Sequence, residues 1–113
     1  MILFLYGTLL DPEVLARMSG EPDLPRRLRP ARLQGWRRVF LRGTPYPTLV
    51  EDAASVVEGA AVRAGPAALA RLSEYEGSAY AMVPLTVMTD GGPLRARAWI
   101  APASRADADR PWP

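Results

Sequence analysis

The chain is 113 residues long and carries 14 basic side chains against 12 acidic ones, which gives a formal net charge of +2. That length allows one domain with a substantial core but not two. Its hydrophobic content of 49% is ordinary for a globular protein, and no apolar run approaches the roughly 20 residues of a membrane span. We therefore expect one soluble domain with no membrane partner.

The residue types that are missing restrict the chemistry more than those that are present. The sequence contains no histidine and no cysteine, and every basic side chain is an arginine. Catalysis by a serine–histidine or cysteine–histidine pair is therefore impossible within this chain, as is a lysine Schiff base. Zinc or haem bound through histidine or cysteine is excluded; a carboxylate-only magnesium or calcium site is not, but no calcium-loop spacing occurs. We expect no cofactor, and the only proton-transfer groups available are carboxylates and tyrosines.

The chain begins with a predicted strand, a glycine turn and a short helix. Residues 2–5 form an apolar run without a basic leader, which is typical of a buried strand rather than of a signal peptide. Together with the absence of cysteine, this favours a cytoplasmic location. Asp11 and Pro12 supply an N-cap and a first-turn proline, and Gly20 ends the helix. The turn at residues 6–10 exposes N–H groups that can bind a carboxylate or an oxyanion, although most such turns are only connections.

A basic stretch follows the first helix. Residues 21–30 form a connection rich in proline and arginine, and residues 31–42 are interpreted as strands broken at Gly35. The basic cluster consists of Arg26, Arg27, Arg29, Arg32, Arg37 and Arg38. Such a cluster suits nucleic acid, but the net charge is small and the replacement of every lysine by arginine looks like compositional bias. Nucleic-acid binding is therefore a third interpretation of the chain, which its composition does not favour.

The middle of the chain is predicted to be irregular. Residues 43–50 form a rigid extended loop that leads into a short strand, because two prolines restrict the backbone there. Tyr46 in this loop is interpreted as a packing residue rather than a ligand contact. Residues 51–55 are predicted to be a polar turn. Residues 56–62 then form a strand whose central Gly59 marks a bulge or a close approach of two backbones.

The last third of the chain is predicted to hold a β-hairpin and a tail. Residues 82–89 form a strand that Pro84 confines to an edge or a bulge, and residues 94–100 return as its partner after a glycine-rich turn. Residues 101–113 are a polar tail, which either docks late or stays disordered, on a domain spanning residues 1–100. About six strands and two helices result, which indicates an α+β fold with a mixed or antiparallel, barrel-like sheet.

The main candidate for a proton-transfer group is a carboxylate at the end of the second predicted helix. The helix begins at Pro66 and ends near Gly77, a natural C-cap residue. Leu69, Leu72 and Glu76 are spaced i, i+3 and i+7, so they share the face that should meet the interior. Burial and the helix macrodipole both disfavour a charge there, so the pKa of Glu76 is expected to rise toward neutrality, where carboxylates transfer protons. From spacing alone, a surface glutamate at a frayed helix end is the competing interpretation.

Four short motifs occur in a fixed order along the chain. They are YGTL at residues 6–9, YPTL at residues 46–49, VEG at residues 57–59 and LSEYEGSAY at residues 72–80. In this order they resemble the γ-glutamylcyclotransferase-like superfamily, in particular its small bacterial and γ-glutamylamine cyclotransferase-like members. The resemblance covers the chain from Met1 to about Ile100.

The resemblance implies a small α+β barrel with one cavity. It implies Glu76 as the catalytic acid and base, and the following substrate-binding residues: Tyr6, Gly7, Thr8, Leu9 and Tyr80. The implied reaction closes a γ-glutamyl amide into 5-oxoproline and expels an amine, with the substrate's own α-amine as nucleophile. The expected partner is a small γ-glutamyl molecule, bound by a monomer or homodimer. The alternative is a non-catalytic module of the same fold that binds a small ligand.

Overall fold

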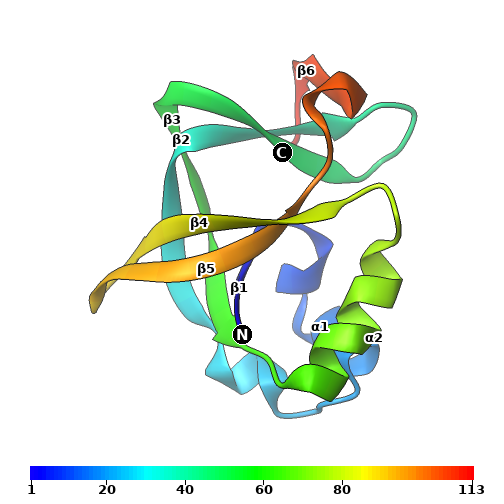
Figure 1. Cartoon of the computed structure of the whole chain (residues 1–113), viewed down its shortest axis with the longest axis vertical. Coiled ribbons are helices and arrows are strands. Elements are labelled where there is room, and N and C mark those ends of the chain that lie inside the picture. The colour runs from blue at the N-terminus through cyan, green and yellow to red at the C-terminus, as the bar shows by residue number, and fades with distance from the viewer.

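Five strands close into a barrel, and two α-helices pack together on one side of it, in a computed structural model that describes residues 1–113 (Figure 1). The elements are β1 Ile2–Leu5, α1 Pro12–Ser19, β2 Arg29–Leu41, β3 Pro47–Arg63, α2 Pro66–Glu76, β4 Ala81–Thr89, β5 Gly92–Ile100 and β6 Ala106–Pro111, with short 3-10 helices at Thr8–Leu10, Leu24–Arg27 and Ala103–Arg105. The barrel order is β3-β1-β5-β4-β2, a further β2–β3 pairing closes it, and β6 extends β2. Only the β1–β5 pairing is parallel. The predicted α+β barrel is thus confirmed.

The central strand β1 is buried on both faces, as its apolar run predicts. Phe4 points into the barrel interior, whereas Leu3 and Leu5 pack on the other side with residues of the two helices, among them Leu15 and Leu72. Burying each such side chain contributes roughly 1.5–3 kcal/mol to folding. The strand therefore joins the barrel to the helical layer and fixes where its carboxyl end emerges. Neither α-helix is long and apolar enough to cross a membrane.

The two α-helices begin and end where the sequence predicts. In α1 the Asp11 side chain accepts a 2.9 Å hydrogen bond from the Glu13 N–H, and Gly20 has a positive φ of 74°. In α2 proline again occupies the first turn, and Gly77 ends the helix with a φ of 81°. A side chain at Gly77 would be strained at that φ. Glu76 is consequently fixed as the last residue of α2.

Two predicted interruptions of the sheet are wrong. β2 continues through Gly35, which has a φ of 87° and sits at a register shift between β2 and β3 rather than at a strand end. Residues 51–55 belong to β3, a strand of 17 residues, and do not form a separate turn before a short strand. The turn-forming chemistry is still present, because Asp52 accepts hydrogen bonds from the Ala54 N–H and the Ser55 hydroxyl. The register shift opposite Gly35 is a bulge in β3, and these local bonds accommodate its extra residues without ending the strand.

Gly59 and Pro84 behave as the sequence predicts. A Cβ atom at Gly59 would lie 2.3 Å from the Leu5 carbonyl oxygen and 2.9 Å from the Phe4 ring, so two backbones approach closely here. Strand β4 pairs with β5 along its length but with β2 only at Met88. Pro84 therefore has an unpaired neighbouring side, where its missing N–H costs nothing.

The segment 101–113 docks on the barrel. It forms a 3-10 turn and then β6, which pairs with β2 in an antiparallel register that includes Leu41 and Ala106. The indole Nε1–H of Trp112 donates a 3.0 Å hydrogen bond to the Pro45 carbonyl. Of the two possibilities left open by the sequence, docking describes the structure, and the segment completes one end of the sheet (Figure 1).

Candidate active site

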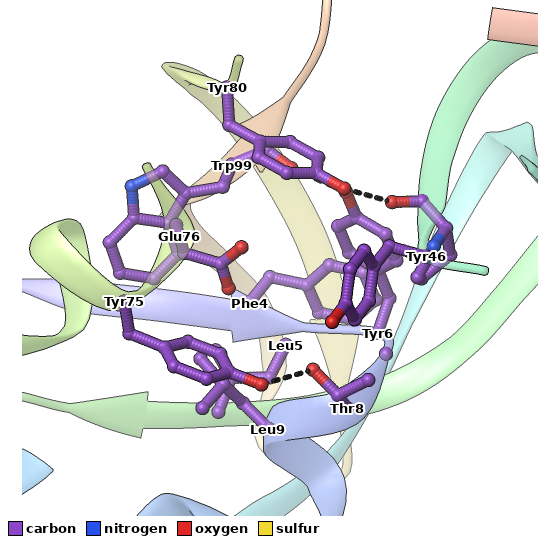
Figure 2. Close-up of a pocket in the computed structure, with 12 residues that line it drawn as sticks. Phe4, Leu5, Tyr6, Thr8, Leu9, Tyr46, Tyr75, Glu76, Tyr80 and Trp99 are labelled. Atoms are coloured by element: carbon purple, nitrogen blue, oxygen red, sulfur yellow. Dashed lines mark hydrogen bonds between the residues drawn. The ribbon is translucent and has the colours of Figure 1, made fainter. Parts of the chain in front are cut away.

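A cavity of about 150 Å³ opens between the carboxyl end of β1, the loop before β3 and the end of α2 (Figure 2). It is lined by 12 residues: Phe4, Leu5, Tyr6, Gly7, Thr8, Leu9, Tyr46, Pro47, Tyr75, Glu76, Tyr80 and Trp99. All of the residues that the sequence assigns to substrate binding or catalysis are among them. The fold therefore brings residues from the first and last thirds of the chain to one place.

Glu76 is the one charged side chain in the wall of the cavity. Figure 2 shows its carboxylate pointing into the cavity, near the rings of Tyr75, Tyr80 and Trp99. Burial among these side chains raises the pKa of Glu76 from 4.5 to about 7. The direction agrees with the shift expected from the helix face that Glu76 shares with the fully buried Leu72. A glutamate directed to bulk solvent at a frayed helix end is not what the structure contains.

The turn after β1 forms the wall facing α2. The Leu10 N–H donates to the Gly7 carbonyl at 3.0 Å, which starts the 3-10 helix, while the Gly7 N–H has no hydrogen-bond partner within the chain. The first N–H groups of such a helix likewise have no partner inside it. The Thr8 hydroxyl lies 3.0 Å from the Tyr75 hydroxyl, which links the turn to α2. Backbone donors and a carboxylate thus share the cavity.

The Tyr6 side chain is a structural part of this wall. It is buried, and its hydroxyl group donates a hydrogen bond to the Trp99 carbonyl oxygen. Burial, reinforced by the charges of Tyr80 and Glu76, raises the pKa of Tyr6. The Tyr6 hydroxyl therefore stays protonated and holds β5 against the end of β1.

Tyr80 and Tyr46 form the remaining aromatic wall. The Tyr80 hydroxyl donates a 2.8 Å hydrogen bond to the Pro47 carbonyl, and burial raises the pKa of Tyr80 to about 12. Tyr46 is 50% exposed and lines the cavity, so its interpretation as a packing residue is wrong. The extended loop holds this ring at the rim instead of in the core, and Figure 2 shows it across the cavity from Glu76.

Sequence reasoning also left five further residues of the wall unassigned: Phe4, Leu5, Pro47, Tyr75 and Trp99. Tyr75 directly precedes Glu76, and its place next to a candidate catalytic carboxylate was an available signal. Trp99 comes from β5 and carries no local signal. It reaches the cavity only because β5 pairs with β1, where Leu3 opposes Arg97.

The basic cluster of the sequence is partly engaged within the chain. Arg27 forms a 3.1 Å ion pair with Glu21, and Arg37 forms one of 3.3 Å with Asp52. Arg38 donates a 3.0 Å hydrogen bond to the carbonyl oxygen of a cavity residue. Three of the six guanidinium groups in the cluster thus have internal partners.

Comparison with known proteins fits this geometry. A family model described as Gamma-glutamyl cyclotransferase, AIG2-like, matches residues 3–113. This chain belongs to that family. The match confirms the resemblance carried by the four short motifs, and it extends through the docked segment that follows Ile100.

Solved structures show the same fold as this AIG2-like chain. An Arabidopsis thaliana protein studied in solution is 25% identical, with a TM-score of 0.76, 96% coverage of this chain and 72% of the plant protein. A second Arabidopsis thaliana protein is 28% identical, with a TM-score of 0.72 and coverages of 88% and 61%. A gamma-glutamyl cyclotransferase of 20% identity has a TM-score of 0.76 with coverages of 90% and 66%, and shows the shared fold. No curated protein matches the chain.

Proposed function

We propose that this chain converts a γ-glutamyl amide into 5-oxoproline and a free amine, with Glu76 as general acid and base. The observation that carries the proposal is a partly buried carboxyl group whose pKa is about 7, in a cavity that the backbone turn at residues 6–9 closes on the other side. Membership of a gamma-glutamyl cyclotransferase family supplies the class of substrate.

The reaction requires no nucleophile from the protein, which agrees with a chain that has no histidine, cysteine or lysine. The α-nitrogen of the glutamyl group attacks its own γ-carbonyl carbon and forms the lactam bond. The amide bond between that carbon and the leaving nitrogen then breaks. The protons lost by the α-ammonium end on the leaving nitrogen, so the step balances without water, oxidant or reductant.

Glu76 is suited to both proton transfers. A group with a pKa of about 7 is present in both protonation states near neutral pH. An α-ammonium with an ordinary pKa of about 8 can donate to such a carboxylate at a cost of roughly 1.4 kcal/mol. The protonated Glu76 can then donate to the departing amine. Positioned acid–base catalysis of this kind contributes about 10² to 10⁴-fold in rate.

The turn at residues 6–9 and Tyr80 are proposed to position the substrate. The free Gly7 N–H and its neighbours can donate to either the α-carboxylate or the oxyanion that develops on the γ-carbonyl. Both assignments place an anionic group of the substrate against backbone donors. Confining the flexible glutamyl chain in a small cavity adds to the rate, because effective molarities of well-oriented groups reach roughly 10⁵ M and above.

The test measures 5-oxoproline release from a panel of γ-glutamyl peptides and γ-glutamyl amines. We expect release with at least one substrate, and its loss by about 10²-fold or more in Glu76→Gln. Glu74→Gln is the matched control, because Glu74 is exposed on the same helix and does not line the cavity. If Glu74→Gln keeps the wild-type rate and both variants unfold cooperatively, the loss of activity is specific to Glu76.

Two results would contradict the proposal. If Glu76→Gln folds and keeps full activity, Glu76 is not the acid–base group. If no substrate on the panel yields 5-oxoproline but one of them binds in calorimetry, the chain is a small-ligand-binding module of the same fold.

A further inference from the structure

Trp112 lies outside the cavity and is hydrogen-bonded to Pro45 and Arg38, two residues that adjoin its wall. Its indole Nε1–H donates to the Pro45 carbonyl at 3.0 Å, one residue before Tyr46. Its own backbone N–H donates to the Arg38 carbonyl at 3.2 Å, which fixes the indole next to β2. The Trp112 side chain, near the end of the docked segment, is therefore hydrogen-bonded to the loop that carries Tyr46, a cavity residue.

Arg38 extends this connection to the turn at the other side of the cavity. Its guanidinium carbon lies 5.8 Å from the centre of the Trp112 ring, a cation–π contact. The same guanidinium donates a 3.0 Å hydrogen bond to the Tyr6 carbonyl oxygen. Trp112 is thus connected to the turn at residues 6–9 through Arg38, and it is bonded directly to residues 42–46, which form the loop that carries Tyr46 (the Tyr46 loop).

The Tyr46 loop has few other restraints. The Leu41 N–H donates to the Tyr46 carbonyl at 2.8 Å, and the remaining bonds within the loop are short-range contacts of Thr44. On its outer side, the Arg42 N–H donates to the Arg105 carbonyl at 2.8 Å, again within the docked segment. Residues 101–113 therefore hold the loop at both of its ends, and Tyr46 itself is half-exposed at the rim.

We propose that Trp112 is a positioning residue for the substrate site, which sets the place of Tyr46 through Pro45 and of the Tyr6 carbonyl through Arg38. The inference rests on the proposed function of the cavity. In the reactive conformer the γ-carbonyl folds back onto the α-nitrogen beside Glu76, so it is the substituent of the leaving amine that extends across the cavity toward Tyr46 (Figure 2). The docked segment thereby controls affinity on the leaving-amine side without touching the substrate.

Two substitutions separate the bonds of Trp112. Trp112→Phe keeps an aromatic face beneath Arg38 but removes the donor to Pro45, whereas Trp112→Ala removes both contacts. We expect Trp112→Phe to raise KM by about three- to tenfold, because the variant loses one net hydrogen bond that positions the substrate site. The value of kcat should change by less than about twofold. Amide hydrogen exchange of Leu41, whose N–H is bonded to Tyr46, should accelerate by a similar factor.

Arg110→Ala and a Tyr46→Ala background are the controls. Arg110 belongs to β6, and its guanidinium carbon lies 4.5 Å from the centre of the Phe40 ring in β2, so its loss weakens β6 docking but removes neither hydrogen bond of Trp112. We expect Arg110→Ala to keep wild-type KM and Leu41 exchange. In a Tyr46→Ala chain, Trp112→Phe should change KM by less than about twofold. Trp112 acts on KM through the Tyr46 ring, so it has no further effect once that ring is removed.

Either of two results would overturn the inference. One is unchanged Leu41 exchange in Trp112→Phe, and the other is an equal KM effect with and without the Tyr46 ring. The exchange of the Ala64 amide, at the far end of the barrel, reports general loosening and should not change. If the wild-type chain forms no 5-oxoproline, the proposed function fails, and the Leu41 exchange alone then decides whether Trp112 positions the loop.

Discussion

The hydroxyl group of Tyr80 donates a hydrogen bond of 2.8 Å to the carbonyl oxygen of Pro47. This bond joins the connection that follows α2 to the first residue of β3, so it spans the cavity from the Glu76 side to the Tyr46 side (Figure 2). Both partners line the cavity. A hydrogen bond between elements that are far apart in the sequence therefore links these two sides of the site.

Tyr80→Phe should weaken both the fold and the site. The substitution leaves the partly buried Pro47 carbonyl without its donor, which costs about 1 kcal/mol. We expect the urea midpoint to fall accordingly and kcat/KM for 5-oxoproline release to fall by up to about tenfold. Tyr75→Phe, which removes the contact with Thr8 elsewhere in the cavity, is the comparison. An unchanged midpoint in Tyr80→Phe would show that the bond contributes nothing.

The pH dependence of catalysis should report the pKa of Glu76. The proposed first step needs the ionised carboxylate, whose pKa is about 7 in the folded chain. The logarithm of kcat/KM should therefore rise with unit slope in acid, reach a maximum between about pH 7 and 8, and fall at higher pH as the substrate's α-ammonium loses its proton. The measurement is a pH–rate profile from pH 5 to 9, in a stable buffer series. An acid limb with its inflection near the ordinary glutamate value would argue against burial of the catalytic group.

The pH dependence of the free energy of unfolding should report the same raised pKa of Glu76, with no substrate present. The pKa of Glu76 rises from 4.5 to about 7 on folding, so the folded chain holds more protons than the unfolded chain between these values. The favourable contribution of Glu76 to the free energy of unfolding is complete below pH 4.5 and is lost as the pH rises through 7. The total loss is roughly 3 kcal/mol at most. Glu76→Gln should therefore unfold at higher urea than wild type at pH 8.

The difference between Glu76→Gln and wild type should shrink as the pH falls toward 5, where the native carboxyl group is already neutral. Free energies of unfolding at pH 5 and pH 8 provide the test, with Glu74→Gln as the exposed control on the same helix. An equal difference at both pH values would mean that Glu76 titrates alike in the folded and unfolded chains.

Gly59→Ala should be among the most damaging small substitutions in the chain. The added methyl group would lie 2.3 Å from the Leu5 carbonyl oxygen, a backbone atom that cannot move without shifting β1. We expect a loss of about 3 kcal/mol, at the upper end of overpacking costs. In Gly91→Ala the new atom meets nothing nearer than 3.7 Å, so that variant should be close to wild type. A thermal or urea midpoint for each variant decides the matter.

The sequence alone predicted the features that depend on neighbouring residues. The caps at Asp11 and Gly20 and the helix end at Gly77 follow from residues within a few positions of one another, and helix periodicity places Glu76 on the same face as Leu72. The missing histidine, cysteine and lysine also limit the chemistry through composition alone. Local hydrogen bonding and helix periodicity are short-range effects, which is why a linear pattern reveals them.

The errors of sequence interpretation lie where strands meet. Residues 51–55 have the composition of a turn, and Gly35 has the flexibility of a strand end, yet each is carried through the sheet by its partner strand. Tyr46 was misjudged for a related reason. Its exposure depends on a loop that is held at Pro45 by Trp112, which follows 67 positions later in the chain.

The sequence by itself determined which carboxyl group is the candidate for proton transfer and where the helix that carries it begins and ends. Only the tertiary structure decided what surrounds that group. Trp99 and Tyr80 come from separate elements, and the desolvation that raises the pKa of Glu76 exists only after the barrel has closed. Burial is a property of contacts between distant residues, so a linear pattern can indicate the direction of that pKa shift but not the cavity that produces it.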